Sequence, residues 1–315
     1  MTKIFIVIYT TYTHIYQLAL EVKKGVESAD PEAEVELFQV PETLPQEVLT
    51  KMHAPPKPDI PIITAAKLAE ADGFLFGFPT RFGTLPAQFQ SFLDSTGQLW
   101  LTGALKRKFG GLFFSTAGQH GGQETTAFTS VTYFAHHGVN FVPLSTGLPY
   151  QGETSEVIGG SFWGSGTITG SDASRPISEK EKEVARVQGK EFVEIVGTYV
   201  RGTKVTGQLW LTGALKRKFG GLFFSTAGQH GGQETTAFTS VTYFAHHGVN
   251  FVPLSTGLPY QGETSEVIGG SFWGSGTITG SDASRPISEK EKEVARVQGK
   301  EFVEIVGTYV RGTKV

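Results

Sequence analysis

The feature that most constrains this chain of 315 residues is a long internal repeat. The stretch from Thr96 to Val205 recurs, letter for letter, from Thr206 to Val315. Repeat architectures are built from short units that have diverged and that stack on one another, whereas this is a single long copy without a substitution. A natural or engineered tandem duplication of the C-terminal half of a shorter unit, residues 1–205, or an error of sequence assembly, would explain the length of the chain.

The join between the two copies does not lie in a linker. The repeated stretch opens within the run SFLDSTGQLWL, which has the pattern of the end of a helix. We therefore expect one complete domain over residues 1–205. Over residues 206–315 we expect an incomplete half-domain without a ligand site of its own.

Strands and helices alternate along residues 1–205, which is typical of a parallel sheet with helices on both faces. Strands are expected at Lys3–Tyr9, Glu34–Phe38, Gly73–Pro79, Gly110–Ser115 and Val139–Pro143. Helices are expected at His14–Ser28, Ile62–Glu70, Leu85–Ser95, Gln123–His137 and Ser178–Tyr199, with a Pro-rich loop from Pro41 to Pro61 and a Gly/Ser-rich loop through Gly170. The last helix opens with Ser178 and Glu181 in the spacing of a capping box.

This succession predicts an α/β fold, a doubly wound parallel sheet of five strands in the order 2-1-3-4-5. In such sheets ligands bind beyond the carboxyl ends of the strands, where the strand order reverses. Three loops should meet there: Thr10–Ile15 after the first strand, Pro79–Thr84 after the third and Ser115–Gly122 after the fourth.

The first of these loops, in the run YTTYTHIY, offers hydroxyl groups where many nucleotide-binding proteins place glycines. Its three threonines and the free N–H groups at the start of a helix could hold a phosphate without a counter-cation. The alternative is that Thr10, Thr11 and Thr13 only cap the helix.

The other two loops differ in chemistry. PTRFGTLP places Arg81 and an aromatic ring at the tip of the most apolar strand, and Arg81 could either bind ligand oxygens or be a solvated surface charge. STAGQHGGQE is glycine-rich, so its backbone can approach a flat ligand and direct N–H groups at it. Together the three loops predict a site for a planar ligand that carries a phosphate.

Composition excludes several classes of function. The net charge of −3 provides no basic field for nucleic acid. Without cysteine there are no disulfides or thiolate ligands, so redox chemistry must come from a bound cofactor. The first apolar run is too short for a signal peptide, and no segment reaches the ~20 apolar residues of a membrane helix. We therefore expect a cytoplasmic protein whose partner is a small molecule.

Common nucleotide and hydrolase motifs are missing too. No GxGxxG follows the first strand, and no GxxxxGK[ST] occurs. In GGSFWGSG, Trp163 stands where the GxSxG elbow needs its second glycine. His136 and His137 are adjacent, so on a helix they point too far apart to share a metal easily, and no metal site is predicted.

Residues 1–205 resemble the WrbA family of flavodoxin-like, type IV NAD(P)H:quinone oxidoreductases, including its fungal members. The resemblance rests on the runs YTTYTHIYQLA, GFPTRFGTLPAQFQSFLDSTGQLW, STAGQHGGQE and AHHGVNFVPL. It implies an FMN cofactor, NADH or NADPH as electron donor, a quinone as acceptor, and a homo-oligomer, dimer or tetramer. The implied reaction is two hydride transfers at flavin N5, in ping-pong order.

The resemblance also implies roles for particular residues. Binding of the FMN phosphate is implied for Thr10, Thr11, Tyr12, Thr13, His14 and Ile15. Contact with the isoalloxazine ring is implied for Pro79, Thr80, Arg81, Phe82 and Gly83, and for Ser115, Thr116, Ala117, Gly118, Gln119, His120 and Gly121. His136 would lie near the flavin and, with Arg81, take a catalytic role. Trp100, often from a neighbouring subunit, and Tyr12 would contact the substrates.

The chain departs from the bacterial pattern at two points. Thr10 and Thr13 replace a serine and a glycine in the phosphate turn, so the helix entry should be tighter. The third loop is one residue longer, which shifts its expected flavin contacts by one position.

Two other functions fit the same fold. A one-electron flavodoxin-type carrier would need a strong acidic docking patch, which the mild charge argues against. A flavin-binding or flavin-free scaffold at a membrane domain would associate peripherally with the plasma membrane. Measured NAD(P)H-dependent quinone reduction separates the enzyme from both.

The second copy has no equivalent of residues 1–95. It could compete with the first copy for them, but looping out the first copy costs on the order of 4 kcal/mol, so the contiguous fold should win. Apolar strands of the second copy would then keep unpaired edges, which predicts domain swapping, aggregation or proteolytic loss down to about Val205.

Overall fold

The structure, a computed structural model, describes residues 1–144, 150, 155–201, 215–228, 232–254, 260 and 265–312. Its main sheet contains the parallel strands β1 (Lys3–Ile8), β2 (Glu34–Gln39), β3 (Gly73–Pro79), β4 (Phe109–Thr116) and β5 (Asn140–Phe141), in the order β2-β1-β3-β4-β5. These five strands lie in the predicted order, but the sheet contains further strands, so the predicted five-stranded sheet is matched only in part.

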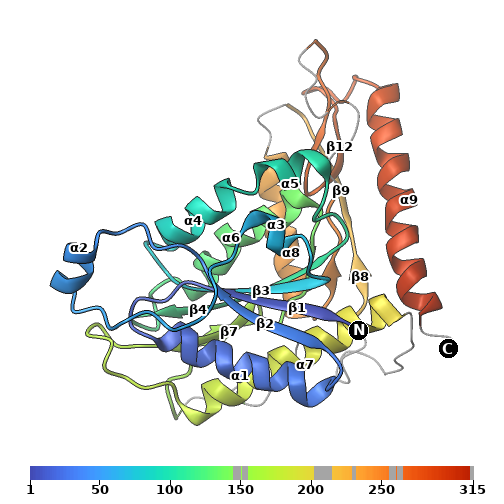
Figure 1. The fold of residues 1–315 in the computed structure, drawn as a ribbon. Coiled ribbons are helices and arrows are strands. Elements are labelled where there is room, and N and C mark those ends of the chain that lie inside the picture. Colours follow the sequence, from blue (N-terminus) through green and yellow to red (C-terminus); the bar gives the residue numbers. More distant parts are fainter. Residues whose placement is uncertain are drawn as a thin grey trace.

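Helices cover both faces of this sheet (Figure 1). One face carries α1 (His14–Ala29) and α7 (Glu179–Arg201), and the other carries α3 (Ala65–Leu68), α4 (Ala87–Asp94), α5 (Gly97–Thr102) and α6 (Gln123–His137). Successive side chains of a strand point to opposite faces. In β1, Ile4, Ile6 and Ile8 therefore pack under α1 and α7, while Phe5 and Val7 pack toward α4 and α6. Burial on both sides explains why the strands are apolar throughout.

The fifth strand differs from the prediction. In place of a strand over Val139–Pro143, β5 spans two residues, and the carboxyl-terminal part of β4 pairs instead with β7 (Gly164–Ile168). β7 forms a hairpin with β6 (Gly160–Ser161), inside the stretch predicted as a loop. A Cβ on Gly164 would lie 1.9 Å from the carbonyl oxygen of Leu112. Glycines are thus needed for this strand to approach β4, and they give it the composition of a loop.

Three helices also differ from the prediction. The Pro-rich stretch contains α2 (Gln46–Lys51), and the helix expected over Ile62–Glu70 is reduced to α3. The run SFLDSTGQLWL forms the end of α4 and then the separate helix α5. The capping box of α7 is present, since Ser178 and Glu181 exchange hydrogen bonds of 2.9 and 3.2 Å.

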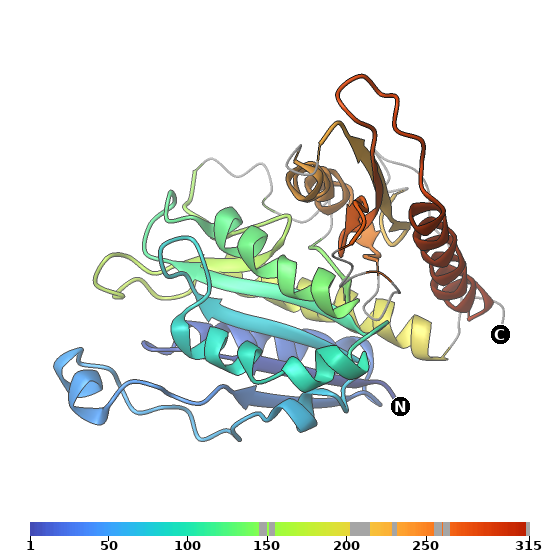
Figure 2. The same ribbon diagram turned by 90° about the horizontal axis from the view of Figure 1, so that it is seen from above.

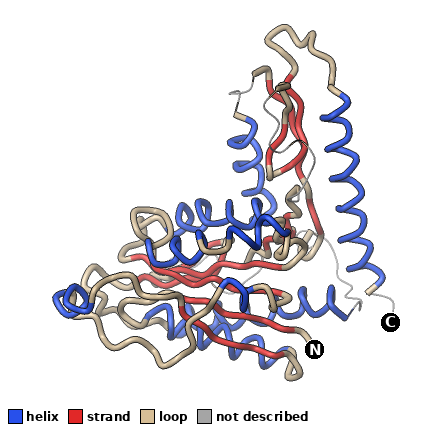
Figure 3. Tube along the Cα trace, turned by 45° about the horizontal axis from the view of Figure 1, so that its top comes forward, coloured by secondary structure: helices blue, strands red, loops and turns tan. Residues whose placement is uncertain are grey.

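The second copy forms the same succession of elements: β8 (Phe219–Gly220), β9 (Leu222–Thr226), α8 (Gln233–His246), β10 (Asn250–Phe251), β11 (Gly270–Ser271), β12 (Gly274–Ile278) and α9 (Glu289–Arg311). β10 and β8 extend the main sheet beyond β5, while β9, β12 and β11 form a separate sheet. Its strands run steeply across those of the main sheet, between α8 and α9 (Figure 3).

β3 pairs with β4 of the first copy, which is the contiguous arrangement that the sequence favours. The second copy packs beside the edge of the main sheet that carries β5 (Figure 2). The join at Val205 and Thr206 lies outside the described residues. Among the described residues, no helix is long and apolar enough to cross a membrane.

Candidate functional site

A cavity of about 360 Å³ opens at the carboxyl ends of β1, β3 and β4, where the strand order reverses. The three predicted loops meet there and are joined by two further segments. The lining residues are Thr10, Thr11, Tyr12, His14, Ile15, Met52, Pro79, Thr80, Arg81, Ser115, Thr116, Ala117, Thr169, Gly170, Ser171 and Ala173. A cavity of this size, with hydroxyl groups on several walls, is typical of a small-molecule site.

The first loop presents a strained entry to α1. The residue that caps the helix, Thr13, has a φ of 70°, in the left-handed region, and its side chain makes no capping hydrogen bond. The first N–H groups of α1 therefore have no hydroxyl from Thr13, which contradicts the capping role considered for this threonine. Thr10 and Thr11 are buried and line the cavity.

Two cations lie beside this loop, and they differ in their partners. Lys57 donates to the carbonyl of Thr10 at 2.8 Å and is paired with Glu42 at 2.6 Å. Burial alone would raise the pKa of Glu42, but hydrogen bonds from Lys57, the Leu44 N–H and Gln88 hold that pKa at about 2. The charge of Lys57 is thus neutralised within the fold.

Arg81 reaches into the cavity. Its Nη1 donates to the Thr80 carbonyl at 2.9 Å and its Nη2 to Thr11 Oγ1 at 3.3 Å. No ion pair of Arg81 with another described residue is present in the structure. The sequence of the first loop predicted that the phosphate would be held without a counter-cation, but the cavity contains the guanidinium of Arg81 next to Thr11, with further N–H donors.

The third loop is braced from behind by Gln123, the first residue of α6. Its amide donates to Thr116 Oγ1 at 3.0 Å and to the Thr167 carbonyl at 3.1 Å. The same threonine hydroxyl donates to the Gly118 carbonyl at 2.8 Å. The hydroxyl of Thr116 is therefore used inside the loop, and the loop holds a defined shape at the cavity.

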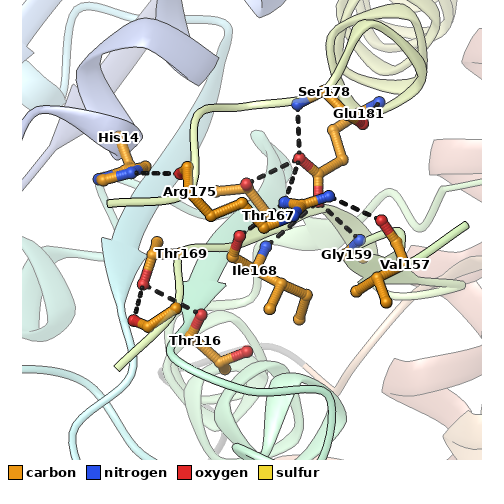
Figure 4. Close-up of polar contacts among 12 residues, drawn as sticks. His14, Thr116, Val157, Gly159, Thr167, Ile168, Thr169, Arg175, Ser178 and Glu181 are labelled. Atoms are coloured by element: carbon orange, nitrogen blue, oxygen red, sulfur yellow. Dashed lines mark hydrogen bonds and ion pairs between the residues drawn. The ribbon is translucent and has the colours of Figure 1, made fainter. Parts of the chain in front are cut away.

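The fourth segment of the cavity, residues 169–173, is held by a buried ion pair (Figure 4). Arg175 contacts the fully buried Glu181 at 3.1 Å and donates to the Ile168 and Val157 carbonyls at 2.6 and 2.7 Å. Glu181 also accepts from Thr167. The Glu181 carboxylate is fully buried and Arg175 is partly exposed, and their hydrogen bonds connect this segment to β7 and to the start of α7.

The network also reaches the first loop. The carbonyl of Arg175 lies 2.9 Å from Nε2 of His14, at the start of α1 (Figure 4). The loop after β1 and the segment before α7 are thereby tied together on one side of the cavity. Also at the cavity lining, the hydroxyl of Tyr12 donates to the Met52 carbonyl at 3.0 Å.

Several predicted site residues do not line this cavity: Thr13, Phe82, Gly83, Gly118, Gln119, His120, Gly121, His136 and Trp100. Phe82 is fully exposed at the tip of its loop. Gln119 and His120 line a separate hollow with Phe162. Trp100 and His136 line another, of about 410 Å³, together with Tyr133 and His137.

The position of His136 follows from the length of α6. The helix begins beside the third loop at Gln123 and rises about 1.5 Å per residue, so His136 lies about 20 Å farther along it. Burial lowers the pKa of His136, although the charge of Glu234 opposes this. Burial, and then the neighbouring His136, lower the pKa of His137 to about 4. Both rings are therefore neutral at pH 7.

Comparisons with known proteins agree with this picture. Residues 13–149 match the family model described as NADPH-dependent FMN reductase. The chain is 51% identical over 196 residues to the NAD(P)H quinone oxidoreductase PST3 of Candida albicans, covering 62% of this chain and 98% of the relative. It is 53% identical over 189 residues to the quinone-oxidoreductase QR2 of Triphysaria versicolor, covering 60% and 92%.

The chain belongs to this family of NAD(P)H quinone oxidoreductases. Among solved structures it is similar to a WrbA-like flavodoxin from Agrobacterium tumefaciens, with 21% identity, a TM-score of 0.42, and coverage of 62% of this chain and 98% of that one.

The sequence did not predict that Met52 and residues 169–173 contribute to the lining of this cavity. The spacing of Ser178 and Glu181 did signal an ordered helix start. The sequence did not indicate that Glu181 also forms an ion pair with Arg175, because that contact depends on strand β7, which was not predicted.

Proposed function

We propose that this chain is an FMN-dependent NAD(P)H:quinone oxidoreductase that reduces quinones by two electrons. The observation that carries the proposal is the meeting of the Thr10–Ile15 loop, Arg81 and the Ser115–Ala117 stretch around one cavity. Half of the aligned residues are identical to those of a relative named for NAD(P)H and quinone.

The residues at the cavity fit a planar cofactor with a phosphate. The hydroxyls of Thr10 and Thr11 and the first N–H groups of α1 would hold the phosphate, since a helix start favours anions. Thr80, Arg81 and the Ser115–Ala117 stretch would border the ring. The cavity lining contains Arg81 but no Asp or Glu, and Arg81 has no carboxylate partner among the described residues, which favours an anionic ligand.

Bound FMN would supply the chemistry itself, accepting a hydride from NADH or NADPH and passing one to a quinone. The protein positions the reactants and provides a dipolar environment. Arg81 is held by the Thr80 carbonyl, and its remaining N–H groups can bind carbonyl oxygens of cofactor or substrate. Backbone N–H groups of the third loop would stabilise negative charge on the ring.

His136, like Trp100, lies outside the cavity of its own unit, although the resemblance implied a neighbouring subunit only for Trp100. Because α6 separates His136 from the third loop by about 20 Å, His136 does not reach the cavity of its own unit. Phe272 of the second copy packs on His136 and lies beside Trp100, so either residue would reach an FMN cavity of another molecule only where residues 206–315 leave this face uncovered. Since burial lowers the pKa of His136, it would contribute a hydrogen bond rather than a positive charge at pH 7.

We assign FMN binding to residues 1–205 alone. The second copy has no counterpart of Thr10, Thr11, Thr80 or Arg81. One FMN per chain is expected, and two per chain would contradict this assignment.

The test is the reduction of benzoquinone by NADH or NADPH with the FMN-loaded chain. Turnover well above that of free FMN is expected, and turnover equal to free FMN would disprove the proposed function. Arg81→Gln should weaken FMN binding about 10-fold to 100-fold, because hydrogen bonds to charged groups contribute about 1.5–3 kcal/mol. Arg186→Gln, which removes a partner of Glu21 away from the cavity, is the matched control.

A further inference from the structure

The two copies contact each other through a reciprocal set of residues. Lys106 and Arg107 of the first copy pair with Glu301 and Glu304 of the second. The matching residues with the roles exchanged also pair: Lys216 with Glu191, and Arg217 with Glu194. The residues that exchange roles occupy equivalent positions in the two copies, and we call such equivalent residues repeat partners.

Aromatic contacts repeat the exchange. Phe272 of the second copy packs on His136 of the first with ring centroids 4.1 Å apart. Phe162 of the first copy packs on His246 of the second at 4.3 Å. The same phenylalanine position and the same histidine position are used in both contacts, with the two copies exchanged. Such an exchange is what a two-fold axis between the copies produces.

At the centre of the interface, residues meet their own repeat partners. Phe128 on α6 contacts Phe238 on α8, and Phe141 on β5 pairs antiparallel with Phe251 on β10. A residue meets its own equivalent across a two-fold interface only near the axis. The axis therefore passes between α6 and α8 and between β5 and β10.

The interface is apolar at this centre and charged at its rim. A single core cluster includes Phe134, Phe141 and Trp163 of the first copy together with Phe251 and Trp273 of the second. Trp163 stacks on Phe141, and Trp273 stacks on Phe251, at 5.7 Å in both cases. An apolar centre with a polar rim is the usual anatomy of a specific protein interface.

Every first-copy residue in these contacts lies between Thr96 and Val205, the stretch that the chain contains twice. We propose that residues 206–315 act as a built-in partner: they cover, in cis, a self-complementary face of residues 96–205 that fits a second copy of the same sequence. The second copy is then neither a competitor for residues 1–95 nor a loose appendage. The proposal does not depend on FMN or on catalysis.

Disulfide trapping tests this proposal in the full chain, which contains no cysteine of its own. Phe128→Cys and Phe238→Cys are combined, and an equal mixture of ¹⁴N-labelled and ¹⁵N-labelled chains is mildly oxidised. Linked peptides should carry one isotope only, because both cysteines belong to the same chain. Mixed-isotope peptides would show pairing between molecules, and the absence of a link would show that the face is not formed. Either result overturns the proposal.

The matched control combines Phe128→Cys with Phe223→Cys, which lies on β9 outside the interface contacts described above and is highly exposed. It should link at least about ten-fold more slowly.

Charge reversal gives a second readout that does not depend on the phenylalanines. Glu301→Lys with Glu304→Lys, added to the cysteine pair, should slow linking several-fold. Adding Lys106→Glu and Arg107→Glu as well should restore it, since the pairs re-form with exchanged signs. Failure of this restoration would argue against the pairing of Lys106 and Arg107 with Glu301 and Glu304.

Discussion

The two copies of the repeat have identical sequences but different surroundings. In the first copy Phe113 and Val193 are completely buried, whereas their partners Phe223 and Val303 in the second copy are 85% and 68% exposed. The first copy lies against β3 and α1, and the second has no equivalent of either. The same letters therefore form the core of one half of the molecule and part of the surface of the other.

The comparison separates what the repeat specifies by itself from what residues 1–95 add. Both copies form the long helix after the third loop, the hairpin before the last helix, and a capping box, Ser178 with Glu181 and Ser288 with Glu291. These depend on contacts within the repeat. The continuous strand β4, in contrast, is broken into β8 and β9 in the second copy, where no β3 supports it.

The largest expected difference between the copies is at their matched phenylalanines. Phe113→Ala should lower the free energy of unfolding of the FMN-binding unit by about 3–5 kcal/mol, because it leaves a cavity in a packed core. Phe223→Ala removes a mostly exposed ring and should change it by less than about 0.5 kcal/mol. Urea unfolding followed by flavin release measures both.

Equal effects of these two substitutions would show that the second copy, not the first, sometimes pairs with β3. The exposed ring of Phe223 keeps aggregation through the second copy a prediction, whereas the core shared by the two copies argues against its proteolytic loss.

A second difference concerns acid. The pKa of His137 is lowered to about 4 by burial and by His136, from an ordinary value of about 6.5. Between these values the unfolded chain binds a proton that the folded chain does not, so stability present above pH 6.5 is lost as the pH falls toward 4. The loss is on the order of 3 kcal/mol. His137→Asn should flatten this part of the pH profile of the unfolding free energy.

His247 is the repeat partner of His137 and is only half buried. His247→Asn is therefore the control for losing a histidine outside the complete core. If His137→Asn and the unchanged chain lost stability equally from pH 6.5 to 4, burial of His137 would not explain the acid response.

A smaller difference is expected at a pair of glycines. A Cβ on Gly111 would lie 2.6 Å from Cδ2 of the buried Leu75, whereas one on Gly221 would meet Phe302 at 3.4 Å. Gly111→Ala should cost about 1–2 kcal/mol through overpacking, and Gly221→Ala should cost much less. Thermal unfolding of the two variants distinguishes them, and a larger loss for Gly221→Ala would contradict the assigned pairing of β3 with β4.

The same comparison shows why much of the fold was predictable and part was not. Strands such as Gly73–Pro79 and helices such as Gln123–His137 have the observed bounds, because their apolar patterns and glycine ends are local signals. β7 was missed because glycines that let it approach β4 look like a loop. Its pairing is set by residues far away in the sequence.

The site was predictable to the same extent. The three loops were placed together because the strand order alone brings them to one edge of the sheet. His136 does not line the cavity of its own unit, and its expected contact with the flavin stays a prediction, since a resemblance in sequence does not say which molecule of an assembly a side chain serves. Arg81 was named from its loop, but its contact with Thr11 required the fold.

The smallest expected change in stability concerns residues 1–95, which contact the first copy and have no equivalent beside the second. Thr13 and Thr64 both stand at the N-cap position of a helix, but only Thr64 caps it. Thr13 has a φ of 70° and no side-chain cap, whereas Thr64 has a φ of −116° and accepts a hydrogen bond from the Lys67 N–H. A left-handed conformation costs a branched residue about 1–2 kcal/mol. Glycine avoids this cost but loses more backbone entropy on folding, which lowers the stability by about 0.5–1 kcal/mol. Thr13→Gly should therefore stabilise the protein by up to about 1 kcal/mol, and Thr64→Gly should destabilise it by a few tenths. Urea unfolding measures both free energies of unfolding. A larger loss of stability for Thr13→Gly than for Thr64→Gly would contradict this expectation and would show that contacts of the Thr13 side chain stabilise the turn.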